Sequence, residues 1–151
     1  MKGDLFIFTD GGARGNPGPA AVGFIVKDDK GKVLRKEGKC LGKATNNIAE
    51  YQAVIEALKW IKDQLTIKQP ARRDSSGMQP STINFFLDSR LIVSQLNGLF
   101  KIKNHGLRQL IVEVRRLEQA VGGNVAYHFI PREKNRDADA LVNQALNSNI
   151  L

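Results

Sequence analysis

The chain has 151 residues, enough for one domain with its own hydrophobic core, and we expect a single domain over residues 1–151. Its 23 Lys and Arg residues outnumber its 15 Asp and Glu residues, and the formal net charge of +8 favours nucleic acid as a partner over an anionic membrane surface. The single cysteine excludes an internal disulfide, and because no apolar run resembles a signal peptide or approaches the roughly 18 residues of a membrane span, we expect a cytoplasmic protein without membrane attachment.

The first predicted element is a buried strand, because Leu5 to Phe8 form an unbroken apolar run. This strand is expected to end at Asp10, which Gly11 and Gly12 follow directly. Ligands bind at the carboxyl ends of strands in open α/β sheets, and glycines allow a backbone or a sugar–phosphate chain to approach closely. Asp10 is therefore either a residue of a functional site or the start of a turn, which Asp-Gly pairs often form.

An antiparallel meander and a long helix follow. Residues 20–27 (AAVGFIVK) and 32–41 (KVLRKEGKCL) are predicted as strands joined by a hairpin turn at 28–31, so the first three strands run antiparallel. Residues 47–65 carry apolar side chains at helical spacing and are predicted as an amphipathic helix. The connection at 66–82 is rich in Pro, Ser, Gly and Arg, and we expect a mobile loop insertion there.

The second half of the chain begins with another apolar strand, residues 83–87 (INFFL), which also ends in an aspartate, Asp88. Two helices, a strand and a final helix follow, which we place at residues 91–96, 106–120, 124–130 and 136–147. The order β-β-β-α-β-α-α-β-α predicts a mixed sheet with helices packed against it.

Glu50 lies close to the centre of the apolar stripe of the first long helix. A carboxylate on the buried side of a helix is costly unless it is paired or binds a metal. The alternative is a capping box, in which Asn47 caps the helix and Glu50 bonds back to the cap amide.

Asp10, Glu50 and Asp88 together offer three oxygen ligands of the kind that hard divalent cations need. The last helix offers a fourth carboxylate, and its geometry does not choose between Asp137 and Asp139. Such a cluster would repel itself without cations. With two Mg²⁺ ions about 3.5–4 Å apart, it becomes the arrangement that hydrolyses phosphodiesters by in-line attack.

Four blocks of the sequence carry these features. They are TDGGARGNPG (9–18) followed by AAVGF, TNNIAEYQAVIEAL (45–58), DSRLIVSQLNG (88–98) and the weaker PREKNRDADALVNQA (131–145). In this order, and over nearly the whole chain, they resemble type 1 ribonuclease H. The resemblance implies an α/β, ribonuclease H-like fold: a five-stranded mixed sheet, three antiparallel strands then two parallel, with helices on both faces.

The resemblance also implies an activity, namely metal-dependent endonucleolytic hydrolysis of the RNA strand of an RNA–DNA hybrid, leaving 5′-phosphate and 3′-hydroxyl ends. The family's catalytic and metal-binding carboxylates fall on Asp10, Glu50, Asp88 and Asp139, which selects Asp139 over Asp137. The implied cofactor is a pair of Mg²⁺ ions, with Mn²⁺ as a substitute. We expect a monomer.

Recognition of RNA requires contact with 2′-hydroxyls, which lie in the wide minor groove of the hybrid. By resemblance, the substrate contacts fall on Gly11, Gly12, Asn16, Thr45, Asn46 and Asn47. Asn46 or Asn47 is also expected to cap the helix. Phosphate contacts are assigned to basic side chains, with Lys101, Lys103 and Arg108 as candidates, although a solvated basic face explains them equally well.

The loop before the last helix departs from some relatives, which carry a histidine there. Here the candidates in residues 131–135 are Arg132, Glu133 and Lys134, and Glu133 is the candidate for an auxiliary role in metal exchange or proton transfer. His128 falls inside the preceding strand, where we expect a packed or edge residue.

A second departure concerns substrate grip. Residues 98–105 are too short for the basic, tryptophan-rich protrusion of some relatives, and the only tryptophan is Trp60 in the first long helix. We expect grip to be weaker or to come from elsewhere, for example from Arg72 and Arg73.

Two other functions fit the same fold. One is a non-catalytic module that binds hybrids or double-stranded RNA, and the presence of all four carboxylates weighs against it. The other is a nuclease with a different substrate, such as a 3′–5′ exonuclease or a junction resolvase, and the 15–18 and 45–47 segments weigh against that.

Overall fold

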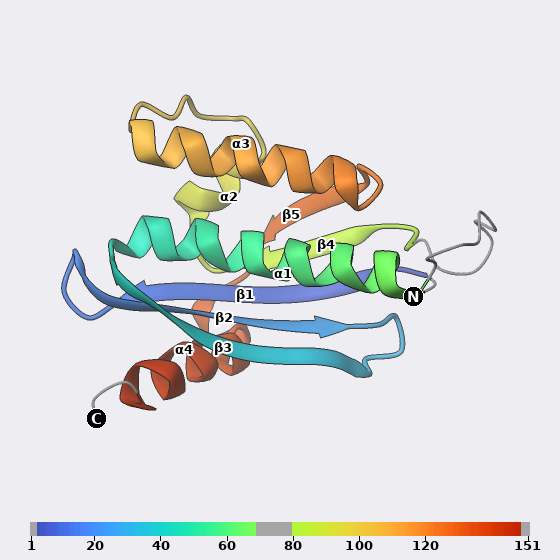
Figure 1. Ribbon diagram of the computed structural model, residues 1–151, viewed down its shortest axis with the longest axis horizontal. Coiled ribbons are helices and arrows are strands. Elements are labelled where there is room, and N and C mark those ends of the chain that lie inside the picture. Colours follow the sequence, from blue (N-terminus) through green and yellow to red (C-terminus); the bar gives the residue numbers. More distant parts are fainter. Residues whose placement is uncertain (1–2, 69–79, 149–151) are drawn as a thin grey trace.

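The computed structural model describes residues 3–68 and 80–148 and places a five-stranded sheet at the centre of the molecule (Figure 1). The strand order across the sheet is β3-β2-β1-β4-β5. β1 pairs antiparallel with β2, and β2 with β3, whereas β1, β4 and β5 run parallel, as the resemblance implied. The strands are β1 (Leu5–Ala13), β2 (Gly18–Lys27), β3 (Val33–Ala44), β4 (Ile83–Leu87) and β5 (Val125–Phe129).

Helices cover both faces of the sheet, as expected. α1 packs on β1 and β2 from one side and carries α3 above it, while α4 lies on β1, β2 and β3 from the other side (Figure 1). Among residues 3–68 and 80–148, no helix is both long and apolar enough for a membrane span. The helices are α1 (Asn46–Lys68), α2 (Arg90–Leu96), α3 (His105–Ala120), the 3-10 turn η1 (Arg132–Lys134) and α4 (Arg136–Ser148).

The main core lies between the sheet and α1. Leu5 and Ile7 of β1 are fully buried in one cluster with Val54 and Leu58 of α1, which confirms the helical stripe expected from the sequence. At the far end of β1 the two elements come closer still, because a Cβ on Gly11 would overlap the backbone of Ala49. This close approach brings the first turns of α1 directly beside the end of β1.

β1 does not end at Asp10, and that prediction is wrong. The strand continues to Ala13, since Asp10 to Ala13 keep their antiparallel partners on β2. The parallel pairing with β4 stops earlier, at Phe8 opposite Phe86. Asp10 therefore lies within a strand but beyond the end of its neighbour.

The expected loop at 66–82 is only partly described. Residues 66–68 belong to the last turn of α1, so the helix extends beyond the predicted end at residue 65. Residues 69–79, which include Arg72 and Arg73, lie outside the described residues. The prediction of a mobile insertion, and of substrate grip from those two arginines, stays a prediction.

Candidate active site

A cavity of about 430 Å³ opens where β4 stops and β1 continues. Residues from the end of β1, the start of α1, the segment after β4 and the α4 helix line it. Four carboxylates are among these lining residues, namely Asp10, Glu50, Asp88 and Asp139. The structure thus brings together the residues that the sequence singled out from four distant segments.

Three of these carboxylates form a compact cluster. Asp10 and Glu50 are each 8% exposed, and Asp88 is half-buried at the end of β4. One carboxylate oxygen from each of the three lies within 4.8 Å of the other two. The Oε1 atom of Glu50 also accepts a hydrogen bond from the backbone N–H of Gly11 at 3.4 Å. This cluster could hold a divalent cation, since such ions prefer closely spaced carboxylate oxygens.

The environment of the cluster penalises negative charge. Burial raises the pKa of Asp10 to about 7, and the nearby charge of Asp88 adds to the rise. Burial also raises the pKa of Glu50 well above its usual range, with a further contribution from Asp10. The Oε2 atom of Glu50 is buried without a hydrogen-bond partner. In the part of the chain that the structure describes, no Lys or Arg forms an ion pair with these three groups, and a bound cation would supply the counter-charge.

Asp139, and not Asp137, joins this cavity. Asp139 is half-buried, accepts a hydrogen bond from Asn143 Nδ2 at 3.3 Å and adds to the rise in the pKa of Asp10. Asp137 is exposed and faces a different cavity, beside Lys27. The structure thus places Asp139, the residue that the resemblance selected, in the cavity with the other three carboxylates, and Asp137 outside it.

The start of α1 differs from the predicted capping box. Thr45 is the cap, because its Oγ1 accepts a hydrogen bond from the N–H of Ile48 at 3.2 Å. The prediction that Asn46 or Asn47 caps the helix is wrong, and so is the reciprocal bond from Glu50, whose Oε1 bonds to Gly11 instead. The helix starts at Asn46, one residue before the predicted start, and Glu50 lies in its second turn and lines the cavity.

The Asn46 side chain connects α1 to the end of β1. Its Oδ1 accepts a hydrogen bond from the backbone N–H of Ala13 at 2.8 Å, and the backbone N–H of Asn46 donates to Asn16 Oδ1 at 3.0 Å. Asn46 and Asn47 line the cavity together with Gly11 and Gly12. Thr45 and Asn16, two of the predicted substrate contacts, are not among the lining residues, but each accepts a hydrogen bond from a backbone N–H of the first turn of α1.

The loop before α4 contributes Arg132 to the cavity. Glu133, the predicted auxiliary residue, is exposed and is not among the described lining residues. His128 is an exposed residue of the edge strand β5, as expected, with its ring stacked on Phe86 at a centroid distance of 5.2 Å. No histidine among the described residues lines this cavity.

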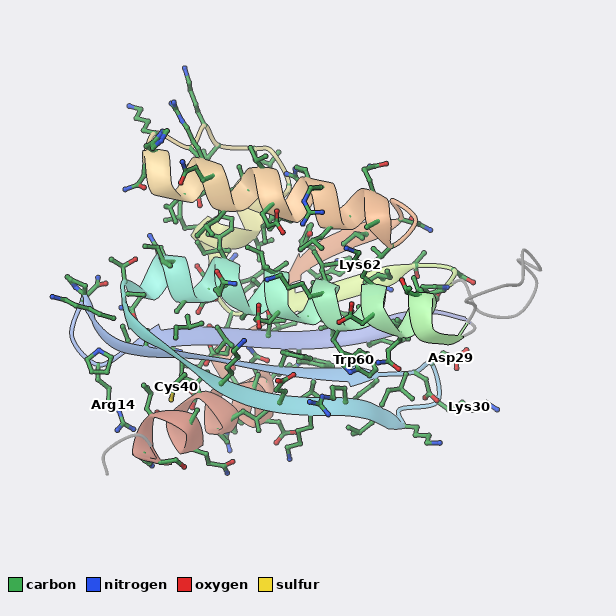
Figure 2. All side chains as sticks on the ribbon, viewed as in Figure 1. Arg14, Asp29, Lys30, Cys40, Trp60 and Lys62 are labelled. Atoms are coloured by element: carbon green, nitrogen blue, oxygen red, sulfur yellow. The ribbon has the colours of Figure 1, made fainter. Side chains whose placement is uncertain are left out.

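Sequence reasoning missed two residues around the site. Arg14 lines the cavity and points from the β1–β2 loop toward α4, where its Nη2 donates to Asn147 Oδ1 at 2.6 Å (Figure 2). Asn135 is 1% exposed, and its Nδ2 donates to Asp88 Oδ2 at 3.0 Å. The one sequence feature that could have identified Asn135 is its place directly before the last helix, and a polar residue at such a place is usually interpreted as a helix cap.

Comparison with known proteins decides the family. The sequence model of the RNase H family matches residues 2–147 of this chain. The chain belongs to the RNase H family. The RNase H resemblance drawn from the four sequence blocks is thereby confirmed.

Curated relatives of this RNase H chain include proteins that are longer than it. It is 35% identical over 144 residues to Ribonuclease HI of Halobacterium salinarum, covering 95% of this chain and 65% of that protein. It is 34% identical over 145 residues to the bifunctional protein Rv2228c of Mycobacterium tuberculosis, covering 95% of this chain and 36% of that protein. The chain thus spans about one third to two thirds of the length of these curated relatives.

A solved RNase H structure matches over almost the full length of both chains. LC11-RNase H1, isolated from compost, has been solved in complex with an RNA/DNA hybrid. It is 35% identical to this chain with a TM-score of 0.84, and the match covers 97% of this chain and 99% of that one. The RNase H fold of this chain is therefore supported by sequence and by shape.

Proposed function

We propose that this protein is a ribonuclease H that cleaves the RNA strand of RNA–DNA hybrids endonucleolytically, leaving 5′-phosphate and 3′-hydroxyl ends. The observation that carries the proposal is the cluster of Asp10, Glu50 and Asp88, whose oxygens lie within 4.8 Å of one another in a cavity of an RNase H chain. The complex of LC11-RNase H1 with an RNA/DNA hybrid supports the choice of substrate. We further propose that the protein acts as a monomer in the cytoplasm.

The carboxylates fit a divalent metal centre. Asp10, Glu50 and Asp88, joined by Asp139, would hold two Mg²⁺ ions, with Mn²⁺ as a substitute. The buried, unpartnered Oε2 of Glu50 and the absence of a basic partner for Asp10 among the described residues both favour a cation at this place. When bound, the ions would activate the attacking water and stabilise the leaving oxygen.

The residues around the carboxylates would orient the hybrid. Gly11 and Gly12 present backbone without side chains, and Asn46 and Asn47 present amides, all facing the cavity. Backbone and amide groups can donate to and accept from 2′-hydroxyls, which distinguish RNA from DNA in the minor groove. Arg132, with its fixed fork of donors, would bind a phosphate of the substrate or product.

The deciding experiment follows the cleavage of a labelled RNA–DNA hybrid with Mg²⁺, with Mn²⁺ and with EDTA. We expect cleavage of the RNA strand only when a divalent ion is present, with 5′-phosphate product ends. Asp10→Asn is expected to retain hybrid binding and to lose cleavage by at least about 10²-fold, because a neutral amide is a poor ligand for a hard cation.

A substrate panel separates the alternatives. Binding of the hybrid without metal-dependent cleavage would favour a non-catalytic module. Preferred cleavage of double-stranded DNA would overturn the assignment of the hybrid as substrate. Equal cleavage of double-stranded RNA would broaden the substrate class beyond hybrids.

A further inference from the structure

Asn135 is a nearly fully buried amide that contacts the carboxylate cluster from the α4 side. It is 1% exposed, directly before the first residue of α4. Its Nδ2 donates two hydrogen bonds, one to Asp88 Oδ2 at 3.0 Å and one to the backbone oxygen of Thr9 at 2.9 Å. It does not line the cavity, so it is not placed to touch a substrate.

The two acceptors fix the orientation of the amide. Both partners are oxygens that can only accept, so the NH₂ group must face them. The Oδ1 atom then points into the protein and has no hydrogen-bond partner among the described residues. Leaving a buried amide oxygen unpaired is unfavourable. The Asn135 amide therefore keeps two donated hydrogen bonds, while its Oδ1 accepts none from the described residues.

The same residue connects three segments that carry carboxylates. Thr9 precedes Asp10 directly, and Asp88 is bonded by the side chain itself. The backbone oxygen of Asn135 accepts from the N–H of Asp139 at 3.2 Å, within the first turn of α4. Asn135 thus bonds to Asp88 itself, to the residue before Asp10 and to the backbone of Asp139, which are three of the four acidic residues of the cavity.

A neutral donor suits this place better than a basic one. Among residues 3–68 and 80–148, none of the four carboxylates forms an ion pair with Lys or Arg. A basic side chain on Asp88 would occupy a lone pair and cancel charge that a cation needs. The Asn135 amide orients one oxygen of Asp88 and leaves its negative charge in place.

We propose that Asn135 is a positioning residue that holds Asp88 in register with Asp10, and that it thereby sets the affinity of the cluster for divalent cations. The inference rests on the proposed metal-dependent function. A positioning role differs from a purely structural one, because loss of a structural residue lowers stability without lowering the affinity for metal.

Asn84 provides the matched control. Its Nδ2 also donates to a backbone oxygen of β1, that of Leu5, at 3.3 Å. Leu5 lies five residues before Asp10, or about 17 Å along an extended strand. Asn84→Ala therefore removes a comparable side-chain bond to the same strand, far from the carboxylates.

The experiment titrates Mn²⁺ into the metal-free wild type, Asn135→Ala and Asn84→Ala, by calorimetry and by the loss of the free Mn²⁺ signal in electron paramagnetic resonance. We expect Asn135→Ala to weaken Mn²⁺ binding by about 10–100-fold, the usual effect of removing a group that orients a ligand. Asn84→Ala should bind Mn²⁺ within about twofold of the wild type, since no ligand depends on it. Hybrid cleavage by Asn135→Ala should recover as Mn²⁺ is raised.

The outcomes separate the two proposals. Mn²⁺ affinity within twofold of wild type in a folded Asn135→Ala protein overturns the positioning role while leaving the proposed nuclease intact. A wild type that binds no Mn²⁺ overturns both. If Asn135→Ala does not fold, the Mn²⁺ affinity of Asn135→Ser is measured instead, because the serine side chain is too short to bridge both acceptors. An affinity within twofold of the wild type then overturns the positioning role, and weaker binding supports it.

Discussion

The side chain of Asp10 is held where its charge is unfavourable. Burial, and second the nearby charge of Asp88, raise its pKa from 3.8 to about 7. The folded protein therefore binds a proton more tightly than the unfolded chain does. The stability that this proton brings is complete below about pH 4 and is lost as the pH rises through about 7.

We predict that Asp10→Asn is more stable than the wild type at pH 8 in EDTA, by roughly 1–3 kcal/mol, because each unit of pKa shift corresponds to about 1.4 kcal/mol. At pH 4 the difference should largely vanish, since Asp10 is protonated there. Thermal unfolding of both proteins at the two pH values measures this. Groups outside the carboxylate cluster, such as Glu56 with its lowered pKa, cancel in the comparison.

Adding Mg²⁺ at pH 8 should raise the melting temperature of the wild type and leave Asp10→Asn nearly unchanged. Equal stability of the two proteins at pH 8 without metal would contradict the electrostatic account of the cluster.

Arg132 and Glu133 offer a second test at the scale of single residues. Arg132 lines the cavity and Glu133 does not, so the structure favours the cation over the carboxylate as the auxiliary group. Arg132→Ala should lower kcat/KM for hybrid cleavage by about 10-fold or more, since a charge-assisted bond to phosphate contributes about 1.5–3 kcal/mol. Glu133→Gln should change it less than twofold. Steady-state kinetics with Mg²⁺ gives both values, and the reverse ranking would restore Glu133 as the candidate.

At the scale of elements, strand and helix positions could be predicted because short apolar runs mark the buried strands and apolar side chains at helical spacing mark the helices. All five strands and the four α-helices expected from the sequence are present. The error at Asp10 arose because consecutive glycines usually indicate a turn, whereas here β2 provides partners that extend the strand. The error at the start of α1 arose because Thr45, which directly precedes the candidates Asn46 and Asn47, supplies the cap.

The candidate site could be predicted only in part, because some of its residues are defined by how the elements pack and not by the local sequence. Asp10, Glu50 and Asp88 stand out because charge is rare among apolar residues. Asp137 and Asp139 flank the apolar face of α4 symmetrically, so the choice depends on where the helix packs, which periodicity does not contain. Asn135 acts through partners more than 40 positions away, at Thr9 and Asp88, and no local pattern encodes such a contact.

The close approach of β1 and α1 gives a third prediction. A Cβ on Gly11 would overlap the backbone of Ala49, beside Glu50, whereas a Cβ on Gly12 would meet only Val142 Cγ1 at an ordinary 3.7 Å. Gly11→Ala should therefore cost about 1–3 kcal/mol of stability, the range for overpacking, and should displace Glu50 enough to impair cleavage. Gly12→Ala should be nearly neutral in stability. Chemical denaturation of both variants tests this, and equal losses would argue against a close contact at Gly11.

At the scale of the whole molecule, the net charge of +8 coexists with an acidic cavity. Among the described residues, all Lys and Arg side chains except Arg14 and Arg132 lie outside this cavity. Lys101 and Lys103 are exposed in the segment between α2 and α3, and Arg108 is exposed on α3. Phosphate contacts by such side chains release counterions from the nucleic acid, and binding then weakens steeply with salt.

We predict that the affinity of Asp10→Asn for the hybrid decreases as salt is added, and that the logarithm of this affinity is linear in the logarithm of the salt concentration. If Lys101 and Lys103 contact phosphates, replacing each by Ala should reduce the slope by about one. Fluorescence anisotropy over a range of KCl concentrations measures the slopes. An unchanged slope in the double variant would assign these lysines to a solvated face that does not contact the hybrid.

The unequal lengths of β4 and β1 have a consequence for how the protein behaves among other chains. Beyond Phe8, β1 has lost its parallel neighbour, and unpaired strand backbone is a template on which a foreign strand can add. Here Asn135 bonds the oxygen of Thr9, Glu50 bonds the N–H of Gly11, and Asn46 bonds the N–H of Ala13. The side chains that shape the site thus also close the gap in the sheet against self-association.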